Sequence, residues 1–251
     1  MLTILKKING RLRYIAPSRL RFMGSFTQRV AAENGVPKGF TVGYDNANVV
    51  DLNFDLMCEM APWDYPVVYW LAQLLPPNGT LIDAGGHMGT KYRAFSPYLN
   101  IAELDWLVYD VPAVIQAGKA RAVADKLHNL RFVSSLTKEP SPDVFLGSGL
   151  LQYADLSLTE LLSQTDSLPK NVILNKVPLR NGPAVFTLEN FHSGWVPYQI
   201  RNRSQFLLEL QSLGYVIVDQ WNIPSLTHQI ATHPEVGCFE NWGFCLRRNS
   251  D

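Results

Sequence analysis

Apolar and polar residues follow two alternating periods along the middle of the chain. Short apolar runs of the kind that form buried strands are separated by stretches with apolar positions three and four residues apart. The predicted strands lie at Thr80–Asp83, Trp106–Tyr109, Leu130–Val133, Val144–Leu146 and Val172–Leu174. The predicted helices lie at residues 90–99, Pro112–Leu127 and Leu158–Gln164. Strands that alternate with helices indicate a parallel sheet with crossover helices.

The alternation stops after the fifth predicted strand. Residues 176–202 show little periodicity, and we predict an irregular insertion there. A helix is predicted at Ser204–Leu213, with Gly214 as its C-terminal cap. Two strands follow, Tyr215–Trp221 and Trp242–Arg247, with no helix between them. The expected fold class is therefore α/β, a mostly parallel Rossmann-like sheet with an antiparallel terminal strand pair.

We predict a helical and loop-rich extension over residues 1–75, followed by a sheet domain over residues 76–251. Proline and glycine make residues 17–43 loop-rich, apart from one short helix at Thr27–Glu33. Residues 52–75 are predicted to be helical in pieces. We place the breaks at Pro62 and Pro66.

Composition narrows the class of protein. Of the 251 residues, 47% are hydrophobic and 18% charged, with a formal net charge of zero, which supports a packed core and argues against a nucleic-acid partner. The longest apolar stretch, Tyr65–Leu75, is too short to cross a bilayer. Three cysteines and no export signal indicate reduced thiols and a cytoplasmic location. Their spacing fits no common zinc pattern, so we expect no metal site.

The N-terminal segment is strongly basic. Seven basic residues precede the first acid, Glu33: Lys6, Lys7, Arg11, Arg13, Arg19, Arg21 and Arg29. Apolar residues recur at helical spacing within it: Leu5, Ile8, Leu12 and Ile15. Such a basic amphipathic helix could contact an anionic membrane surface peripherally, or it could be an ordinary solvated first helix.

The segment after the first predicted strand carries the clearest chemical signal. Asp83 ends the strand, and Gly85, Gly86 and Gly89 follow before a helix. Glycine lets a backbone approach a ligand closely, and ligands of open α/β sheets sit beyond the carboxyl ends of the strands. A dinucleotide fingerprint would need glycine where Ala84 stands.

The same segment resembles the first motif of class I methyltransferases, Asp-x-Gly-x-Gly-x-Gly, including its Asp-x-Gly-Gly-Gly variant. His87 departs from that motif, because it takes the place of the middle glycine. Its side chain could crowd the methionine part of the cofactor, or it could line the pocket. The resemblance implies S-adenosylmethionine as cofactor.

Three further segments fit cofactor contacts in that fold. Asp110, at the end of the second predicted strand, could accept both ribose hydroxyls, and together with Val111 it could also cap the next helix. Ser134 and Ser135 would lie near the adenine or form a plain polar turn. The candidates that follow the fourth predicted strand are Ser148 for the cofactor, and Gln152 and Tyr153 for the acceptor.

The order of short motifs resembles a bacterial family of class I S-adenosylmethionine-dependent methyltransferases over roughly residues 40–247. The motifs are Gly43-Tyr44-Asp45, the glycine loop with Lys91-Tyr92, Trp106 with Asp110-Val111-Pro112, Ser148 to Tyr153, and Lys176-Val177-Pro178. This resemblance implies a small-molecule or glycan-type acceptor. Members of the family resemble bacterial accessory enzymes, which hints at a role in surface polysaccharide.

Methyl transfer to oxygen benefits from a base and from groups that align the acceptor. Class I methyltransferases commonly place acceptor contacts after the fifth strand, where His192 is the leading candidate base and Glu189 the second. Lys176, Arg180 and Tyr198 are candidate acceptor contacts, although solvation or packing would equally explain them. Two other interpretations stay open, a non-catalytic protein that keeps the fold and, less favoured, an NAD-dependent oxidoreductase.

Overall fold

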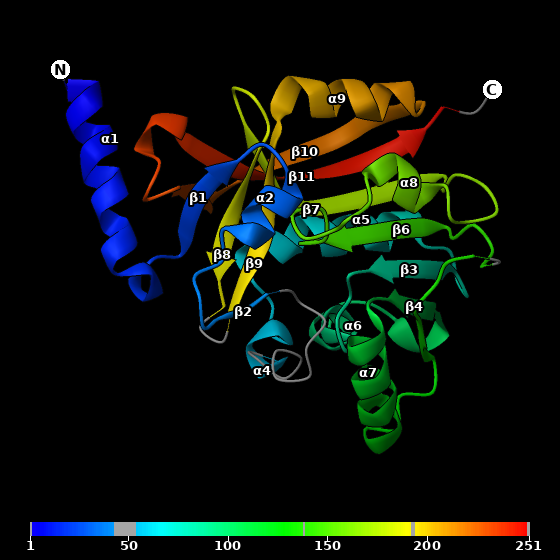
Figure 1. Ribbon diagram of the computed structural model, residues 1–251. Coiled ribbons are helices and arrows are strands. Elements are labelled where there is room, and N and C mark those ends of the chain that lie inside the picture. Colours follow the sequence, from blue (N-terminus) through cyan, green and yellow to red (C-terminus); the bar gives the residue numbers. More distant parts are fainter. Residues whose placement is uncertain (1, 43–53, 138, 192–193, 250–251) are drawn as a thin grey trace. The chain divides into compact units, whose positions relative to one another are not determined.

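The computed structural model describes residues 2–42, 54–137, 139–191 and 194–249 of the chain (Figure 1). It divides into two compact units. The first unit comprises residues 1–44, 178–208 and 222–242, and the second comprises residues 45–177, 209–221 and 243–251. The boundary expected between residues 75 and 76 lies inside the second unit.

The second unit is built on a parallel sheet (Figure 1). Its strands are β3 (Thr80–Ala84), β4 (Asp105–Tyr109), β5 (Leu130–Val133), β6 (Val144–Ser148) and β7 (Asn171–Arg180). They lie in the order β7-β6-β3-β4-β5, and every neighbouring pair is parallel. The terminal pair, β10 (Tyr215–Gln229) and β11 (Cys238–Arg248), is joined through β11 to β7. The predicted mostly parallel α/β sheet is confirmed.

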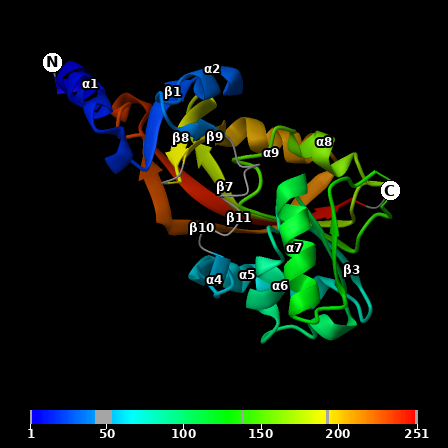
Figure 2. The same cartoon turned by 60° about the horizontal axis from the view of Figure 1, so that its bottom comes forward.

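Short helices accompany these strands, and α4 lies beside α6 (Figure 2). They are α4 (Phe54–Met57), η3 (Pro62–Asp64), α5 (Tyr65–Leu74), α6 (Thr90–Phe95), η4 (Ile101–Glu103), α7 (Pro112–Ala124) and α8 (Leu158–Leu162). A further helix, α9 (Arg203–Ser212), follows β9. The break predicted at Pro66 is wrong, because Pro66 sits in the first turn of α5, where a helix needs no N–H from that residue.

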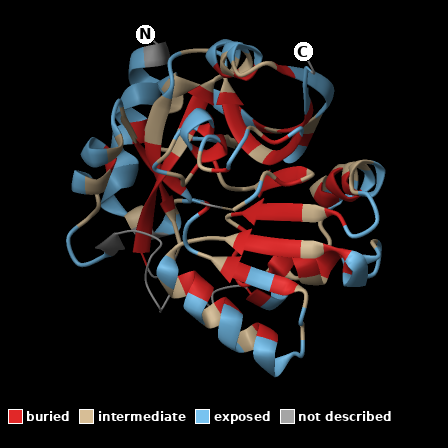
Figure 3. Ribbon diagram, turned by 90° about the vertical axis from the view of Figure 1, so that its right-hand side faces the viewer, coloured by how far each residue is buried: buried red, intermediate tan, exposed pale blue. Residues whose placement is uncertain are grey.

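The strands of the second unit form its buried layer (Figure 3). The largest core cluster joins Trp106 and Val144 of the sheet to Phe95 of α6 and Leu71 of α5. β3 lies at the centre, with β4 on one side and β6 on the other. Chain order reverses there, so the carboxyl end of β3 is the topological switch point at which open α/β sheets bind ligands.

The strands of the first unit form a sheet that also includes the last residues of β7. Its elements are α1 (Leu2–Leu12), η1 (Arg13–Ile15), η2 (Pro17–Arg19), β1 (Phe22–Phe26), α2 (Arg29–Asn34), β2 (Thr41–Val42), β8 (Val185–Asn190), β9 (Gly194–Asn202) and η5 (Pro234–Val236). β8 pairs antiparallel with both β1 and β9. β9 also pairs in parallel with β2 and with Leu179 and Arg180 of β7.

The irregular insertion predicted at residues 176–202 is therefore wrong, because most of that segment is in β7, β8 and β9. Residues on both faces of β9 are buried, including Trp195, Val196 and Tyr198. A strand covered on both faces lacks the alternation of apolar and polar residues by which strands are recognised. The loop-rich assignment of residues 17–43 likewise missed β1, where Phe22 and Met23 are buried.

Candidate functional site

The loop that follows β3 is shaped by glycines in conformations that other residues rarely adopt. Gly85 has φ +70° and donates its N–H to the carbonyl of Tyr109 on β4 at 2.8 Å. Gly89 has φ +77°, and a Cβ there would lie 2.6 Å from the side chain of Leu130. The loop is thereby fixed to the carboxyl edge of the sheet, as the sequence indicated.

Asp83 lies beneath this loop and is only 1% exposed. Trp106 on β4 donates its indole N–H to the Asp83 carboxylate at 3.2 Å. A Cβ at Gly86 would lie 2.5 Å from Asp83 Oδ2, so the loop backbone rests directly on the carboxyl group. Burial raises the pKa of Asp83 to about 7, although the Trp106 hydrogen bond and the charge of Lys91 oppose that rise.

His87 occupies the loop position where the methyltransferase motif has its middle glycine. Its φ is +55°, which is the left-handed conformation that glycine would supply. The imidazole is buried and packs at a tilt to Phe54 of α4, with ring centroids 6.4 Å apart. The departure at His87 therefore preserves the left-handed backbone and gives the ring an apolar neighbour.

Asp110 connects this loop to the end of β4. Its Oδ2 accepts the backbone N–H of His87 at 2.9 Å, and its Oδ1 accepts the N–H of Val111 at 2.8 Å. Pro112 then begins α7. Farther along the same edge, Ser134 and Ser135 follow β5 and are exposed. The edge thus carries the candidate cofactor residues from three neighbouring strands.

The ends of β6 and β7 form the other side of the edge. Ser148 on β6 is in register with Asn175 on β7, and the Asn175 amide lies 3.4 Å from the Ser148 hydroxyl. Asn175 also donates to the carbonyl of Trp63 and accepts from the indole of Trp221, at 3.2 and 3.1 Å. Asn175 thus holds several elements of the second unit together, and it was not among the site residues predicted from the sequence.

Lys176 directly follows Asn175 and adopts φ +59°, which is unusual for a residue with a long side chain. A Cβ at Gly149 would lie 3.0 Å from the Lys176 ammonium nitrogen and 3.4 Å from the Gln152 amide nitrogen. Gln152 is 6% exposed, and its Oε1 has no hydrogen-bond partner among the described residues. Tyr153 is half-buried next to it. Lys176 and Gln152, both acceptor candidates, are thus brought together at the Gly149 turn.

The helix that follows the glycine loop carries one member of a buried ion pair. Lys91 on α6 donates to Asp64 Oδ2 at 2.7 Å, and the backbone N–H of Ala61 donates to the same oxygen at 3.2 Å. Asp64 is fully buried, and Lys91 is 8% exposed. Asp64 was not predicted as a site residue, because an acid just before a helix is normally explained as a cap.

Three of the remaining candidates belong to the first unit. Glu189 is buried on β8 and pairs with Arg21 at 3.3 Å. Arg180 donates to the carbonyls of Pro183 and Val236, each at 2.5 Å. Tyr198 packs edge-on against Phe22, and burial raises the pKa of its hydroxyl. His192 lies outside the described residues.

No protein-family model and no curated protein matches the chain in sequence. Among solved structures, it is similar to the 1,6-didemethyltoxoflavin-N1-methyltransferase of Burkholderia thailandensis, solved with 1,6-didemethyltoxoflavin and S-adenosylhomocysteine. That match has 17% identity and a TM-score of 0.51, and it covers 75% of this chain and 79% of that one.

Two further solved structures resemble the chain. The glycopeptide N-methyltransferase MtfA, complexed with S-adenosylhomocysteine, is 12% identical with a TM-score of 0.51 over 82% of this chain and 99% of that one. OxaC, in complex with sinefungin and meleagrin, is 16% identical with a TM-score of 0.53 over 82% of this chain and 53% of that one. The chain thus spans about half of OxaC. These likenesses show that the chain has the Rossmann-like fold of such methyltransferases.

Proposed function

We propose that this chain is an S-adenosylmethionine-dependent methyltransferase with a small-molecule or glycan-type acceptor. The observation that carries the proposal is the glycine loop after β3, held by Asp110 through the 2.9 Å hydrogen bond from His87. The loop lies at the switch point between β4 and β6, where this sheet architecture binds ligands. The two similar methyltransferase structures that contain S-adenosylhomocysteine support the same assignment.

The residues at this edge suit the cofactor. A carboxylate can accept about four hydrogen bonds, so Asp110 can hold the loop and a ribose hydroxyl together. Asp83 is buried and would act by supporting the loop from below. The proposed cofactor-binding set is Asp83, Gly85, Gly86, His87, Gly89, Asp110, Val111, Ser134, Ser135 and Ser148.

When bound, S-adenosylmethionine supplies a methyl group that an acceptor nucleophile takes by in-line displacement, releasing S-adenosylhomocysteine and the proton of the acceptor. The chain would mainly align the acceptor. Gln152 and Lys176 are suited to this because both flank the Gly149 turn beside Ser148. A buried oxygen without a partner is costly, so an N–H or O–H of the acceptor would satisfy Gln152 Oε1.

The other acceptor-side assignments rest on the sequence alone. His192 is the proposed general base, with Glu189 as the second candidate. Tyr153, Arg180 and Tyr198 complete the proposed acceptor-side residues. The Arg21 pair of Glu189 and the packing of Tyr198 give these two residues a structural role as well.

The test is release of S-adenosylhomocysteine from S-adenosylmethionine in the presence of a panel of small hydroxylated, aminated and glycan acceptors. We expect release with one acceptor class. Gln152→Leu or Lys176→Met should then raise the KM for that acceptor at least about tenfold, as expected for a lost hydrogen bond at a buried polar site. Gln116→Leu and Lys119→Met, on the exposed side of α7, are the matched controls and should leave KM unchanged. Tight binding of S-adenosylhomocysteine without turnover across the panel would favour the non-catalytic alternative.

A further inference from the structure

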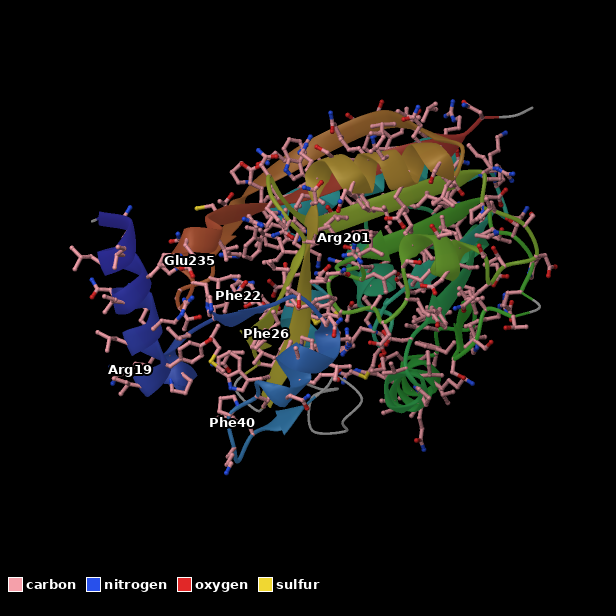
Figure 4. The ribbon with its side chains drawn as sticks, turned by 45° about the horizontal axis from the view of Figure 1, so that its top comes forward. Arg19, Phe22, Phe26, Phe40, Arg201 and Glu235 are labelled. Atoms are coloured by element: carbon pink, nitrogen blue, oxygen red, sulfur yellow. The ribbon has the colours of Figure 1, made fainter. Side chains whose placement is uncertain are left out.

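The N-terminal helix α1 is attached to the first unit by one side. A Cβ at Gly10 would lie 2.6 Å from Pro234 and 2.8 Å from the carbonyl oxygen of Thr232, so the helix backbone approaches this segment closely. Arg11 donates to the same carbonyl and, at 2.5 Å, to Glu235. Figure 4 shows the labelled Glu235 beside α1.

The opposite side of α1 is apolar and exposed. Ile8 lies across the helix from Gly10, because two residues turn an α-helix by about 200°. The side chains of this apolar side extend from α1 into η1, and each is at least half exposed: Ile4 63%, Leu5 53%, Ile8 53%, Leu12 57% and Ile15 82%. In an ordinary surface helix, the apolar side would face the core instead.

Charge indicates what covers this apolar side. The chain as a whole carries no formal net charge, yet seven basic residues and no acidic residue precede Glu33. Lys6, Lys7 and Arg13 are exposed on the helical segment itself. A symmetric contact between two copies of α1 would bring these like charges together, whereas an anionic lipid surface would attract them.

We propose that α1 and η1 dock the protein on an anionic membrane surface, with the apolar side chains at the lipid and the basic side chains at the headgroups. The helix would lie on the surface, because its 11 residues are about 16 Å long. No helix within the described ranges is long and apolar enough to cross a bilayer. This docking is independent of the methyltransferase assignment, because α1 and η1 contain none of the proposed cofactor or acceptor residues.

The test is flotation of the full chain with phosphatidylcholine vesicles, with and without phosphatidylglycerol. We expect binding only to the anionic vesicles, weakened by added salt. Lys6→Glu with Lys7→Glu should weaken partitioning by about 25-fold or more, since each basic residue near such a surface contributes about fivefold. Ile8→Asp with Leu12→Asp should weaken it by at least about tenfold, because both side chains would leave the lipid.

Matched controls lie on α7 and in the turn that follows it. Val123→Asp replaces another exposed apolar side chain, and Lys119→Glu with Lys126→Glu reverses two other exposed charges. Both should keep wild-type partitioning, and circular dichroism should show all variants folded. Failure to float with anionic vesicles would overturn the proposal. Equal loss in these control variants, or a solution dimer that Ile8→Asp with Leu12→Asp dissociates, would also overturn it.

Discussion

The Asp110 carboxylate accepts the backbone N–H of His87 at 2.9 Å, so the end of β4 holds the loop that leaves β3. The second oxygen of Asp110 accepts the N–H of Val111 at 2.8 Å, just before α7. Asp110 is therefore both a support for the glycine loop and the proposed ribose contact. Changing this one residue tests both roles together.

Replacing Asp110 with Asn should weaken binding of S-adenosylhomocysteine by about 10- to 100-fold, since hydrogen bonds to a charged group are worth about 1.5–3 kcal/mol. Calorimetric titration measures the effect. Asp105→Asn is the matched control, because Asp105 begins the same strand and pairs with exposed Arg131 at 2.7 Å. Equal affinity in the two variants would remove Asp110 from the cofactor site.

Gly86→Ala tests the contact between the loop and Asp83. The added Cβ would lie 2.5 Å from Asp83 Oδ2, and such overpacking typically costs about 1–3 kcal/mol of unfolding free energy. Urea unfolding should show this loss in the wild-type background and a smaller loss in an Asp83→Ala background. A cost that is the same in both backgrounds would mean that the loop does not rest on this carboxylate.

The buried pair of Lys91 and Asp64 should respond strongly to removal of one partner. Lys91→Met leaves the fully buried Asp64 without its cation and should cost about 3–5 kcal/mol of unfolding free energy. The double variant Lys91→Met with Asp64→Leu should recover part of that loss. Arg131→Met, at an exposed pair, should cost at most about 1 kcal/mol. A loss at Lys91 as small as that at Arg131 contradicts the buried pair.

The raised pKa of Asp83 predicts a pH dependence of stability. The folded state keeps the proton up to about pH 7, whereas an Asp carboxyl in the unfolded chain loses it near its ordinary pKa of 3.8. The contribution of Asp83 is therefore present at low pH and lost as the pH rises through 7. Between pH 5 and pH 8, the wild type should lose about 2–3 kcal/mol relative to Asp83→Asn, which cannot titrate. Parallel pH profiles of unfolding free energy for the two proteins would show that Asp83 is ionised throughout.

The parallel sheet could be predicted from sequence because its strands are short apolar runs between clear helix signals. β5 begins and ends where predicted, and β3 and β4 differ from their predictions by one residue. The glycine loop was also recognisable, because Asp83 and the glycines are adjacent in the chain. Local sequence is therefore sufficient to predict an element when the structure of that element depends on residues that are adjacent in the chain.

Long-range pairing explains what sequence did not predict. β8 pairs with β1 and β9 pairs with β2, both of which lie far away in the chain. Consecutive residues of β8 and β9 are buried, so their side chains show no clean alternation. The Asp64–Lys91 pair joins residues 27 positions apart, and Asn175 contacts Trp63 across 112 positions. No local pattern encodes such contacts. The unit boundary likewise follows from contacts between distant segments.

Calorimetric titration of the wild-type protein with S-adenosylhomocysteine, with NAD as the comparison ligand, tests the methyltransferase assignment. We expect one binding site for S-adenosylhomocysteine, with a Kd in the micromolar range or tighter, and no measurable heat of binding with NAD. Binding of NAD alone would assign the glycine loop to a dinucleotide. Absence of binding by a folded protein would contradict the methyltransferase assignment itself.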